Sequence, residues 1–148
     1  MDEPYIPEIE QLKNLSFFFF ISYENLNWIN KLLYFRKYVK SELIITEGDK
    51  GQAFYIIYSG SAYVVKKVHG QDQEILNVID RPGDFFGEMS LLEDRPRSAG
   101  VVAAEETELL VIEKESFFEL INKFPQFTLF IARSIAERLR RSDWNLIQ

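Results

Sequence analysis

The spacing of apolar residues changes twice along the chain, and each change marks a different kind of structure. In the N-terminal part, apolar side chains recur three, four or seven residues apart, which is typical of one face of a helix. They belong to Leu12, Leu15, Phe19, Leu26, Ile29 and Leu33. We therefore expect residues 8–40 to be the helical part of the chain, with the helical pattern running from Glu8 to Phe35.

Within this part, residues 15–21 form an apolar run that contains four consecutive phenylalanines. The run is about a third of the ~20 residues that a helix needs to cross a bilayer. It also lacks the basic start and small-residue cleavage site of a signal peptide. We expect these phenylalanines to pack on the domain, with no membrane contact, and we expect the protein to be cytoplasmic.

Between residues 42 and 113 the pattern becomes that of short β-strands. Runs rich in isoleucine, valine and tyrosine alternate with turns that contain glycine, aspartate or proline, at intervals of about 8–12 residues. The predicted strands are 43–46, 54–58, 62–68, 74–79, 98–103 and 108–112. This arrangement is typical of an antiparallel sandwich, jelly roll or small barrel. His69, in a predicted hairpin turn, should be solvated.

A third pattern begins at Glu115. Ser116 and Glu119 have the spacing of a capping box, which predicts a short helix ending at Phe124. Pro125 is a favoured first residue of a helix and predicts a longer one. The apolar stripe of that longer helix comprises Phe127, Phe130, Ile131, Ile135, Leu139 and Leu146, and its flanks carry Arg133, Glu137, Arg138, Arg140 and Arg141.

These patterns predict an α+β fold in one domain over residues 1–148. An antiparallel β-sandwich or jelly-roll barrel, residues 42–113, is flanked by N-terminal helices and by C-terminal helices within 116–146, of which the last is long. The apolar stripe of the last helix also suits a paired helix, so we expect a homodimer formed through it; the alternative is that the stripe packs wholly on its own domain.

Composition excludes several kinds of chemistry. The chain has no cysteine, which removes disulfides, thiolate nucleophiles and cysteine-bound metal clusters. Its single histidine cannot supply the several histidine ligands of a cupin-type metalloenzyme, and we find no paired carboxylates or nucleophile–histidine set. We therefore expect no enzyme, no cofactor and no metal site. The net charge of −6 makes binding of nucleic acid by this chain alone unfavourable.

The segment from Gly83 to Val102 carries the strongest chemical signal. It is predicted to form a strand, a sharp turn at Gly87, one helical turn and a return strand. Free N–H groups at the start of that helical turn favour an anion, and Arg97 can grip a phosphate with two parallel N–H bonds. Glu88 can accept a sugar hydroxyl. The alternatives are a surface ion pair of Arg97 with Glu93 or Asp94, and a solvated Glu88.

The same segment resembles the phosphate-binding cassette of cyclic nucleotide-binding domains, especially those of the bacterial cyclic-AMP receptor/catabolite activator type. The cassette reads here as Phe86-Gly87-Glu88-Met89-Ser90-Leu91-Leu92 followed by Pro96-Arg97-Ser98-Ala99, with Gly83-Asp84-Phe85 before it. Upstream, Glu47-Gly48-Asp49 and Ser59-Gly60-Ser61 match the turns of that family. The resemblance extends from about Leu12 to Ser142, nearly the whole chain.

The resemblance implies roles for individual residues. Glu88 would accept the ribose 2′-OH and Arg97 would pair with the cyclic phosphate. The backbone N–H groups of Gly87 and Ser98 and the Ser98 hydroxyl would hold ribose and phosphate, while Ser142, or as second choice Asp143, would reach the base. The implied ligand-binding set is Gly87, Glu88, Met89, Ser90, Arg97, Ser98, Ala99 and Ser142.

Two positions bear on the choice of base. Gly100 stands where the family often has a larger residue, so we expect a looser base side of the pocket. A hydroxyl directly after the arginine, here that of Ser98, can favour guanine in the family. Cyclic AMP is the favoured ligand, and cyclic GMP remains open.

The resulting hypothesis is a non-enzymatic sensor that binds a cyclic nucleotide and relays its presence through the C-terminal helix. The alternative is a domain of the same fold that acts as a dimerisation or interaction module without nucleotide. Family transcription factors add a helix-turn-helix domain after the long helix. Since this sequence stops at Gln148, we expect no DNA-binding domain in it. Whether the chain stands alone or is part of a transcription factor, kinase or channel stays open.

Overall fold

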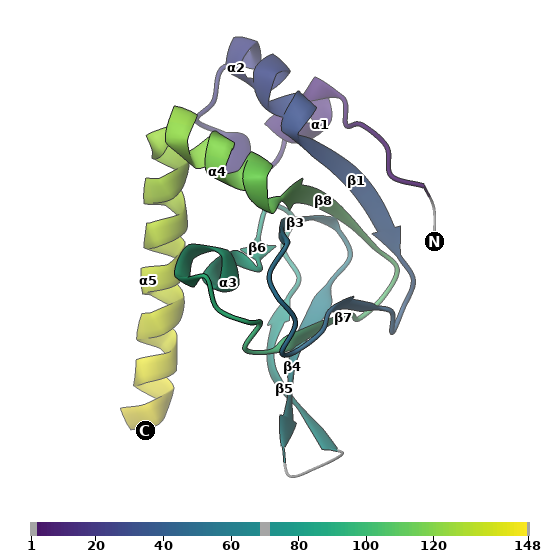
Figure 1. Ribbon diagram of the computed structural model, residues 1–148, viewed down its shortest axis with the longest axis vertical. Helices are drawn as coiled ribbons and strands as arrows, with labels where there is room; N and C mark the ends of the chain where they lie inside the picture. Colours follow the sequence, from purple (N-terminus) through teal and green to yellow (C-terminus); the bar gives the residue numbers. More distant parts are fainter. Residues whose placement is uncertain (1–2, 69–71, 148) are drawn as a thin grey trace.

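The computed structural model describes residues 3–68 and 72–147, with side chains described as far as Arg141. A β-sandwich forms the centre, short N-terminal helices lie at one end of it, and the longest helix stands alongside (Figure 1). His69, expected in a solvated turn, lies outside the described residues. No helix in the described part of the chain has the length and apolar character needed to cross a membrane.

The N-terminal part consists of short helical pieces. They are α1 (Ile9–Lys13), the 3-10 turn η1 (Ser16–Phe18), α2 (Tyr23–Ile29) and the 3-10 turn η2 (Asn30–Leu32). Phe17 and Phe18 are fully buried, whereas Phe19 and Phe20 are exposed. The phenylalanine run therefore packs on the domain as expected, but only two of its rings are buried.

The prediction of helix up to Phe35, within a helical segment 8–40, is wrong for its last part, which is strand β1 (Leu33–Tyr38). β1 pairs antiparallel with β8 along its whole length. Leu33 and Phe35 are buried against the helices, while Tyr34 and Arg36 point to the other face, which is the period of a strand. Pairing with a strand more than seventy residues away outweighs the local helical spacing.

The remaining strands are β2 (Leu43–Ile45), β3 (Ala53–Ser59), β4 (Ala62–Val68), β5 (Asp72–Ile79), β6 (Phe85–Phe86), β7 (Gly100–Ala103) and β8 (Thr107–Glu113). They form two four-stranded antiparallel sheets, in the orders β1-β8-β3-β6 and β2-β7-β4-β5. The predicted antiparallel sandwich, flanked by N-terminal helices and a long C-terminal helix, is confirmed.

Strand β3 shows how the two cores are divided. Phe54 and Ile56 belong to the core between the first sheet and the helices, whereas Tyr55 and Ile57 belong to the core between the two sheets. Because successive side chains of a strand point to opposite faces, a nearly continuous apolar run serves both cores at once. Two-sided burial of this kind fixes the first sheet as the central layer of the molecule.

Two helices follow the sandwich, α4 (Lys114–Lys123) and α5 (Pro125–Ile147), and Pro125 opens the long helix as predicted. The capping box predicted for Ser116 and Glu119 is wrong. α4 begins at Lys114 with Glu113 in the cap position, because β8 leads directly into the helix and the Lys114 N–H bonds to the carbonyl of Gln52. Ser116 therefore lies inside the first turn.

Candidate functional site

The turn between β6 and α3 (Glu88–Glu93) depends on Gly87. Its φ of +91° lies in the left-handed region that favours glycine. A Cβ at this position would lie 3.0 Å from Arg97 Nη1 and 3.2 Å from the carbonyl oxygen of Ala53. The glycine thus allows both the backbone turn and the close approach of the arginine, which brings β6, α3 and the return segment together.

Arg97 is a buried cation, with 7% of its surface exposed. Its Nη1 donates to the carbonyl of Gly87 and its Nη2 to that of Ala53, both at 2.6 Å. Burial lowers the pKa of the guanidinium, while Tyr55 and Glu88 act in the opposite direction. No carboxylate in the described part of the chain forms an ion pair with it, so two carbonyl dipoles hold a charge that lacks a counterion.

The alternative of a surface ion pair of Arg97 with Glu93 or Asp94 is wrong, because the guanidinium points inward, and Asp94 lies instead 3.6 Å from Lys114. Arg95, two residues earlier, is exposed.

Glu88, the first residue of α3, is also buried, with 4% of its surface exposed, so the alternative of a solvated acid is wrong. Burial raises the pKa of its carboxyl above 4.5, and Arg138, its own backbone N–H and Arg97 counteract that rise. A carboxylate in this position is both desolvated and partly neutralised. It therefore remains an acceptor with a cation close by.

The partner of Glu88 is Arg138 on α5, which the sequence analysis placed among the flanking charges of that helix. Arg138 Nη1 lies 3.2 Å from Glu88 Oε1, and Nη2 donates to the carbonyl of Phe85 at 2.6 Å. The guanidinium also covers the Phe85 ring, 4.5 Å from its centroid. One signal for it was available: Arg138 follows Ile131 and Ile135 on the inward-facing stripe, where an arginine is unusual.

Most of the residues expected at the site border one cavity of about 170 Å³. Those residues are Gly87, Glu88, Met89, Ser90, Arg97, Ser98 and Ala99, joined by Asn77 and Arg138 and by apolar side chains of both sheets. The side chain of Ser142, expected at the base, lies outside the described residues, as does that of Asp143. The structure thus brings the polar members of the cassette to a single concave surface.

Two further positions refine the picture. Ser90 borders the cavity, but its Oγ is buried beside Gly51 and has no hydrogen-bond partner among the described residues. Gly100 does not border the cavity: a Cβ there would lie 3.2 Å from the carbonyl of Ile45 and 3.3 Å from Val65 Cγ2. The expectation that Gly100 loosens the base side is therefore wrong, because its small size serves strand packing.

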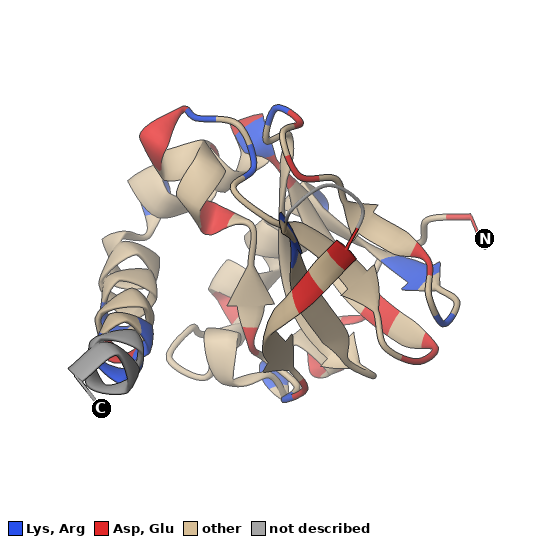
Figure 2. Cartoon of the chain, turned by 90° about the horizontal axis from the view of Figure 1, so that it is seen from below, with Lys and Arg blue, Asp and Glu red and all other residues tan. Residues whose placement is uncertain are grey.

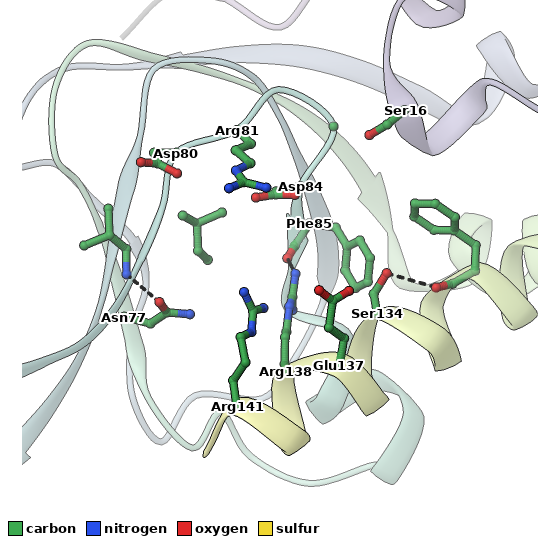
Figure 3. A pocket seen from close by; sticks show the side chains of 14 residues that line it. Ser16, Asn77, Asp80, Arg81, Asp84, Phe85, Ser134, Glu137, Arg138 and Arg141 are labelled. Atoms are coloured by element: carbon green, nitrogen blue, oxygen red, sulfur yellow. Dashed lines mark hydrogen bonds between the residues drawn. The ribbon is translucent and has the colours of Figure 1, made fainter. Parts of the chain in front are cut away.

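A second cavity, of about 240 Å³, lies on the other side of Arg138, between α5 and the segment that joins β5 to β6 (Figure 3). Asn77, Ile79 and Arg138 border both cavities. Arg81 and Arg141 line the second one together with Asp84 and Glu137. The Arg138 side chain therefore forms part of the wall between two adjoining spaces.

Charge over the rest of the surface is mixed. In the view of Figure 2, acidic segments lie among the basic ones on the sandwich, and basic residues occur on the C-terminal part of α5.

Comparison with known proteins identifies the class. The family model for the cyclic nucleotide-binding domain matches residues 35–124, which include the whole cassette. The chain therefore belongs to the cyclic nucleotide-binding domain family.

Among curated relatives, the chain is 38% identical to the cyclic AMP receptor protein of Thermus thermophilus over 117 residues, 78% of this chain and 54% of the relative. It is 34% identical to cGMP-dependent protein kinase 2 of Homo sapiens over 107 residues, 72% of this chain and 14% of the kinase. The chain thus spans about half or less of these relatives. The crystal structure of Thermus thermophilus catabolite activator protein matches with a TM-score of 0.77 and 35% identity, covering 88% of this chain and 61% of that one.

Proposed function

We propose that this chain binds a cyclic nucleotide in the cavity between the cassette and α5, and that it works as a sensor without catalytic activity. The observation that carries the proposal is the pair of buried, oppositely charged groups that face one small cavity. Arg97 lacks a counterion there, and Glu88 is a desolvated acceptor. A ligand with a phosphate and a sugar hydroxyl satisfies both.

In this proposal the cyclic phosphate lies against Arg97 and supplies the missing negative charge. The ribose 2′-OH donates to Glu88, whose charge is already shared with Arg138, so the acid does not repel the phosphate strongly. Ser98 is exposed and borders the cavity, so its hydroxyl is available to the ligand. Charge-assisted hydrogen bonds of this type contribute about 1.5–3 kcal/mol each.

The base extends past Arg138 toward the second cavity. The first cavity measures about 170 Å³ and the second about 240 Å³. Small-molecule sites usually measure about 300–1,000 Å³. Only the two together reach that range, which supports a bound state in which the Arg138 side chain shifts and the nucleotide occupies both. Since Arg138 belongs to α5, its displacement by the ligand would also change the position of that helix.

Cyclic AMP is the favoured ligand and cyclic GMP the second candidate, in keeping with relatives named as a cyclic AMP receptor protein and a cGMP-dependent kinase. Ser98 and Ser142 are the positions at which we expect the choice of base to be made. Gly100 is not one of these positions, because a side chain there would point at Ile45 and Val65.

Most of the stripe predicted for dimerisation packs on the chain's own core instead, namely Phe127, Phe130, Ile131 and Ile135. A second copy of the chain is still the proposed partner of α5, through another face of the helix that includes Leu139. Leu129, Ala132, Ala136 and Leu139 are exposed along this helix and follow one another at spacings of three, four and three residues. That is the spacing of a coiled-coil seam, and two such seams can bury each other in a homodimer.

Isothermal titration of the purified protein with cyclic AMP, cyclic GMP and 5′-AMP tests the proposal. We expect saturable heat for at least one cyclic nucleotide and much weaker binding of 5′-AMP. Absence of heat and of any rise in melting temperature at millimolar cyclic nucleotide would favour the alternative, an interaction module of the same fold that has lost its ligand.

A further inference from the structure

A third cavity lies away from the cassette, on the face of the first sheet that carries Tyr34 and Tyr55. It measures about 450 Å³, within the range of small-molecule sites of about 300–1,000 Å³. β1, β3, β8 and the start of α4 supply its walls. It shares no lining residue with the nucleotide cavity. A ligand here would therefore occupy separate space.

Strand register explains why aromatic rings gather in this cavity. Tyr34 lies directly opposite Val111, and Val111 lies directly opposite Tyr55, so these three side chains form one row across β1, β8 and β3. Residues opposite one another in neighbouring strands share a face of the sheet. Arg36 and Tyr38 follow Tyr34 at intervals of two residues and therefore lie on the same face.

One hydrogen-bond donor beside the cavity has no acceptor among the described residues. This donor is Arg36 Nε, which is buried. Other atoms of this side chain are engaged, since it hydrogen-bonds to the Tyr38 hydroxyl and its guanidinium lies 6.0 Å from the centroid of the Tyr34 ring. Buried donors are almost always paired, so this one calls for an acceptor that the protein does not provide.

The charges around the cavity balance. Arg36 and Lys114 are offset by Glu113 and Glu115, all of which line it. The Glu113 carboxylate also accepts a hydrogen bond from the Tyr34 hydroxyl. The surroundings thus favour neither an anion nor a cation, and a neutral occupant fits them best.

We infer that this tyrosine cavity, lined by Tyr34, Arg36, Tyr38 and Tyr55, is a second small-molecule site that takes a neutral, planar heteroaromatic ring with a hydrogen-bond acceptor. The ring stacks on the tyrosines, and a shift of the Arg36 side chain on binding brings the Nε N–H, which is buried in the structure, to the acceptor of the ring. Aromatic stacking of this kind contributes to binding without requiring charge on the ligand.

The tyrosine cavity lies back to back with the cassette. The Tyr55 ring stacks on that of Phe86, with centroids 5.1 Å apart and planes 13° apart, and Phe86 borders the nucleotide cavity. Ala53, which lines the tyrosine cavity, gives its carbonyl to Arg97. β3 therefore separates the two sites: its residues Ala53 and Tyr55 line the tyrosine cavity and contact Arg97 and Phe86 of the other cavity.

Nicotinamide is a suitable probe, because it is planar and neutral, carries ring-nitrogen and amide acceptors, and has neither ribose nor phosphate. We would titrate it into ¹⁵N-labelled protein and follow the amide signals. The expected result is saturable shifts at residues 33–38 and 53–59 in the wild type and in Arg97→Leu. Arg36→Met, which keeps an unbranched apolar stem, should weaken binding about tenfold or more. Arg133→Met, at an exposed position of α5, should leave it unchanged.

The proposal is overturned if no saturable shift occurs at β1 and β3, if the shifts instead centre on residues 87–99 and vanish in Arg97→Leu, or if Arg36→Met binds nicotinamide as well as the wild type. Crystals of the wild type soaked with nicotinamide give an independent readout. Density for a ring between Tyr34 and Tyr55 supports the site, and water alone contradicts it. Because the probe lacks the cyclic phosphate and ribose, these outcomes do not depend on whether the cassette binds a cyclic nucleotide.

Discussion

The Arg138 guanidinium lies 3.2 Å from the Glu88 carboxylate, although fifty residues separate them in the sequence. The contact joins the C-terminal half of α5 to the first residue of the cassette helix α3. It also closes the nucleotide cavity on the side of the second cavity. The proposed ligand site and the long helix α5 therefore meet at the ion pair of Arg138 with Glu88.

Arg97→Leu should abolish binding of cyclic nucleotides, because it removes the only buried cation proposed to face the phosphate. It also leaves the carbonyls of Gly87 and Ala53 without their donors. We therefore expect a loss of unfolding free energy on the order of 1–3 kcal/mol, in a protein that still folds. Titration calorimetry and urea unfolding measure the two effects. Arg95→Leu, on the exposed side of the same segment, is the control; unchanged affinity in Arg97→Leu would mean that the cassette assignment is wrong.

Glu88→Gln should weaken cyclic nucleotide binding about tenfold, which is less than the effect of Arg97→Leu, since an amide oxygen still accepts one hydrogen bond from the ribose. The comparison is sharpest with 2′-deoxy cyclic AMP. The wild type should discriminate against this ligand, and Glu88→Gln should discriminate less. Equal discrimination by both proteins would show that Glu88 does not bind the 2′-OH.

The same variant tests the burial of Glu88 through pH. Burial raises the pKa of this carboxyl above 4.5, so the folded state takes up its proton more readily than the unfolded state does. The resulting contribution to stability is complete below pH 4.5 and is lost as the pH rises through the raised pKa. Wild type should therefore lose stability relative to Glu88→Gln over that window. Asp84, whose pKa is also raised, is common to both proteins and cancels. A difference that stays constant with pH would contradict the prediction.

Arg138→Gln should loosen α5 from the cassette, because it removes the ion pair to Glu88 and the charged contact over Phe85. We expect faster amide exchange in the second half of α5 and a higher pKa for Glu88, which loses its nearest cation. Arg141→Gln, on the same helix, carries the same charge change, and the structure shows no contact of Arg141 with Glu88, which makes it the matched control. If both variants exchange alike, the contact does not hold the helix.

Gly87→Ala and Gly48→Ala separate backbone strain from crowding. Both glycines have a φ close to +90°, but a Cβ at Gly87 would press on Arg97 and Ala53, whereas one at Gly48 would meet nothing within 4 Å. Each substitution should cost about 1–2 kcal/mol for the left-handed backbone. Gly87→Ala should cost more and should also weaken nucleotide binding. Equal losses of unfolding free energy, with equal affinity, would argue against crowding at Gly87.

Leu139→Lys should reduce self-association if α5 pairs with a second copy of the chain. Leu139 is exposed on the helix, so the substitution leaves the domain's own core intact. Light scattering after gel filtration should show a dimer for the wild type and a shift toward monomer for the variant. Arg133→Lys, at another exposed position on this helix, should leave the molecular mass measured in solution unchanged. A wild type that is monomeric at all concentrations would rule the pairing out.

Local signals were sufficient for much of this fold. Alternating runs and glycine turns located β2 to β5, β7 and β8, and Pro125 located the start of α5. β1 was not predicted as a strand, because its apolar residues continue the helical spacing of the segment before it. It is a strand because it pairs with β8. At the site, the cassette motif indicated Glu88 and Arg97 because both belong to one short segment of the sequence. Arg138 reaches the cassette only through the packing of α5, and no local pattern encodes that distance.

The Phe127 ring, fully buried, packs against Phe17 and Phe18 near the start of α5. Arg138 lies eleven residues further on, a rise of about 17 Å along a helix. The first half of α5 is thus attached through a buried apolar core, whereas Arg138 is attached through an ion pair for which the proposed ligand would compete. If the proposed ligand displaces Arg138, a small tilt of α5 about its buried start at Phe127 would move the region around Arg138 further than the start of the helix. The occupancy of the proposed site would then be reported as a change in the angle between α5 and the β-sandwich.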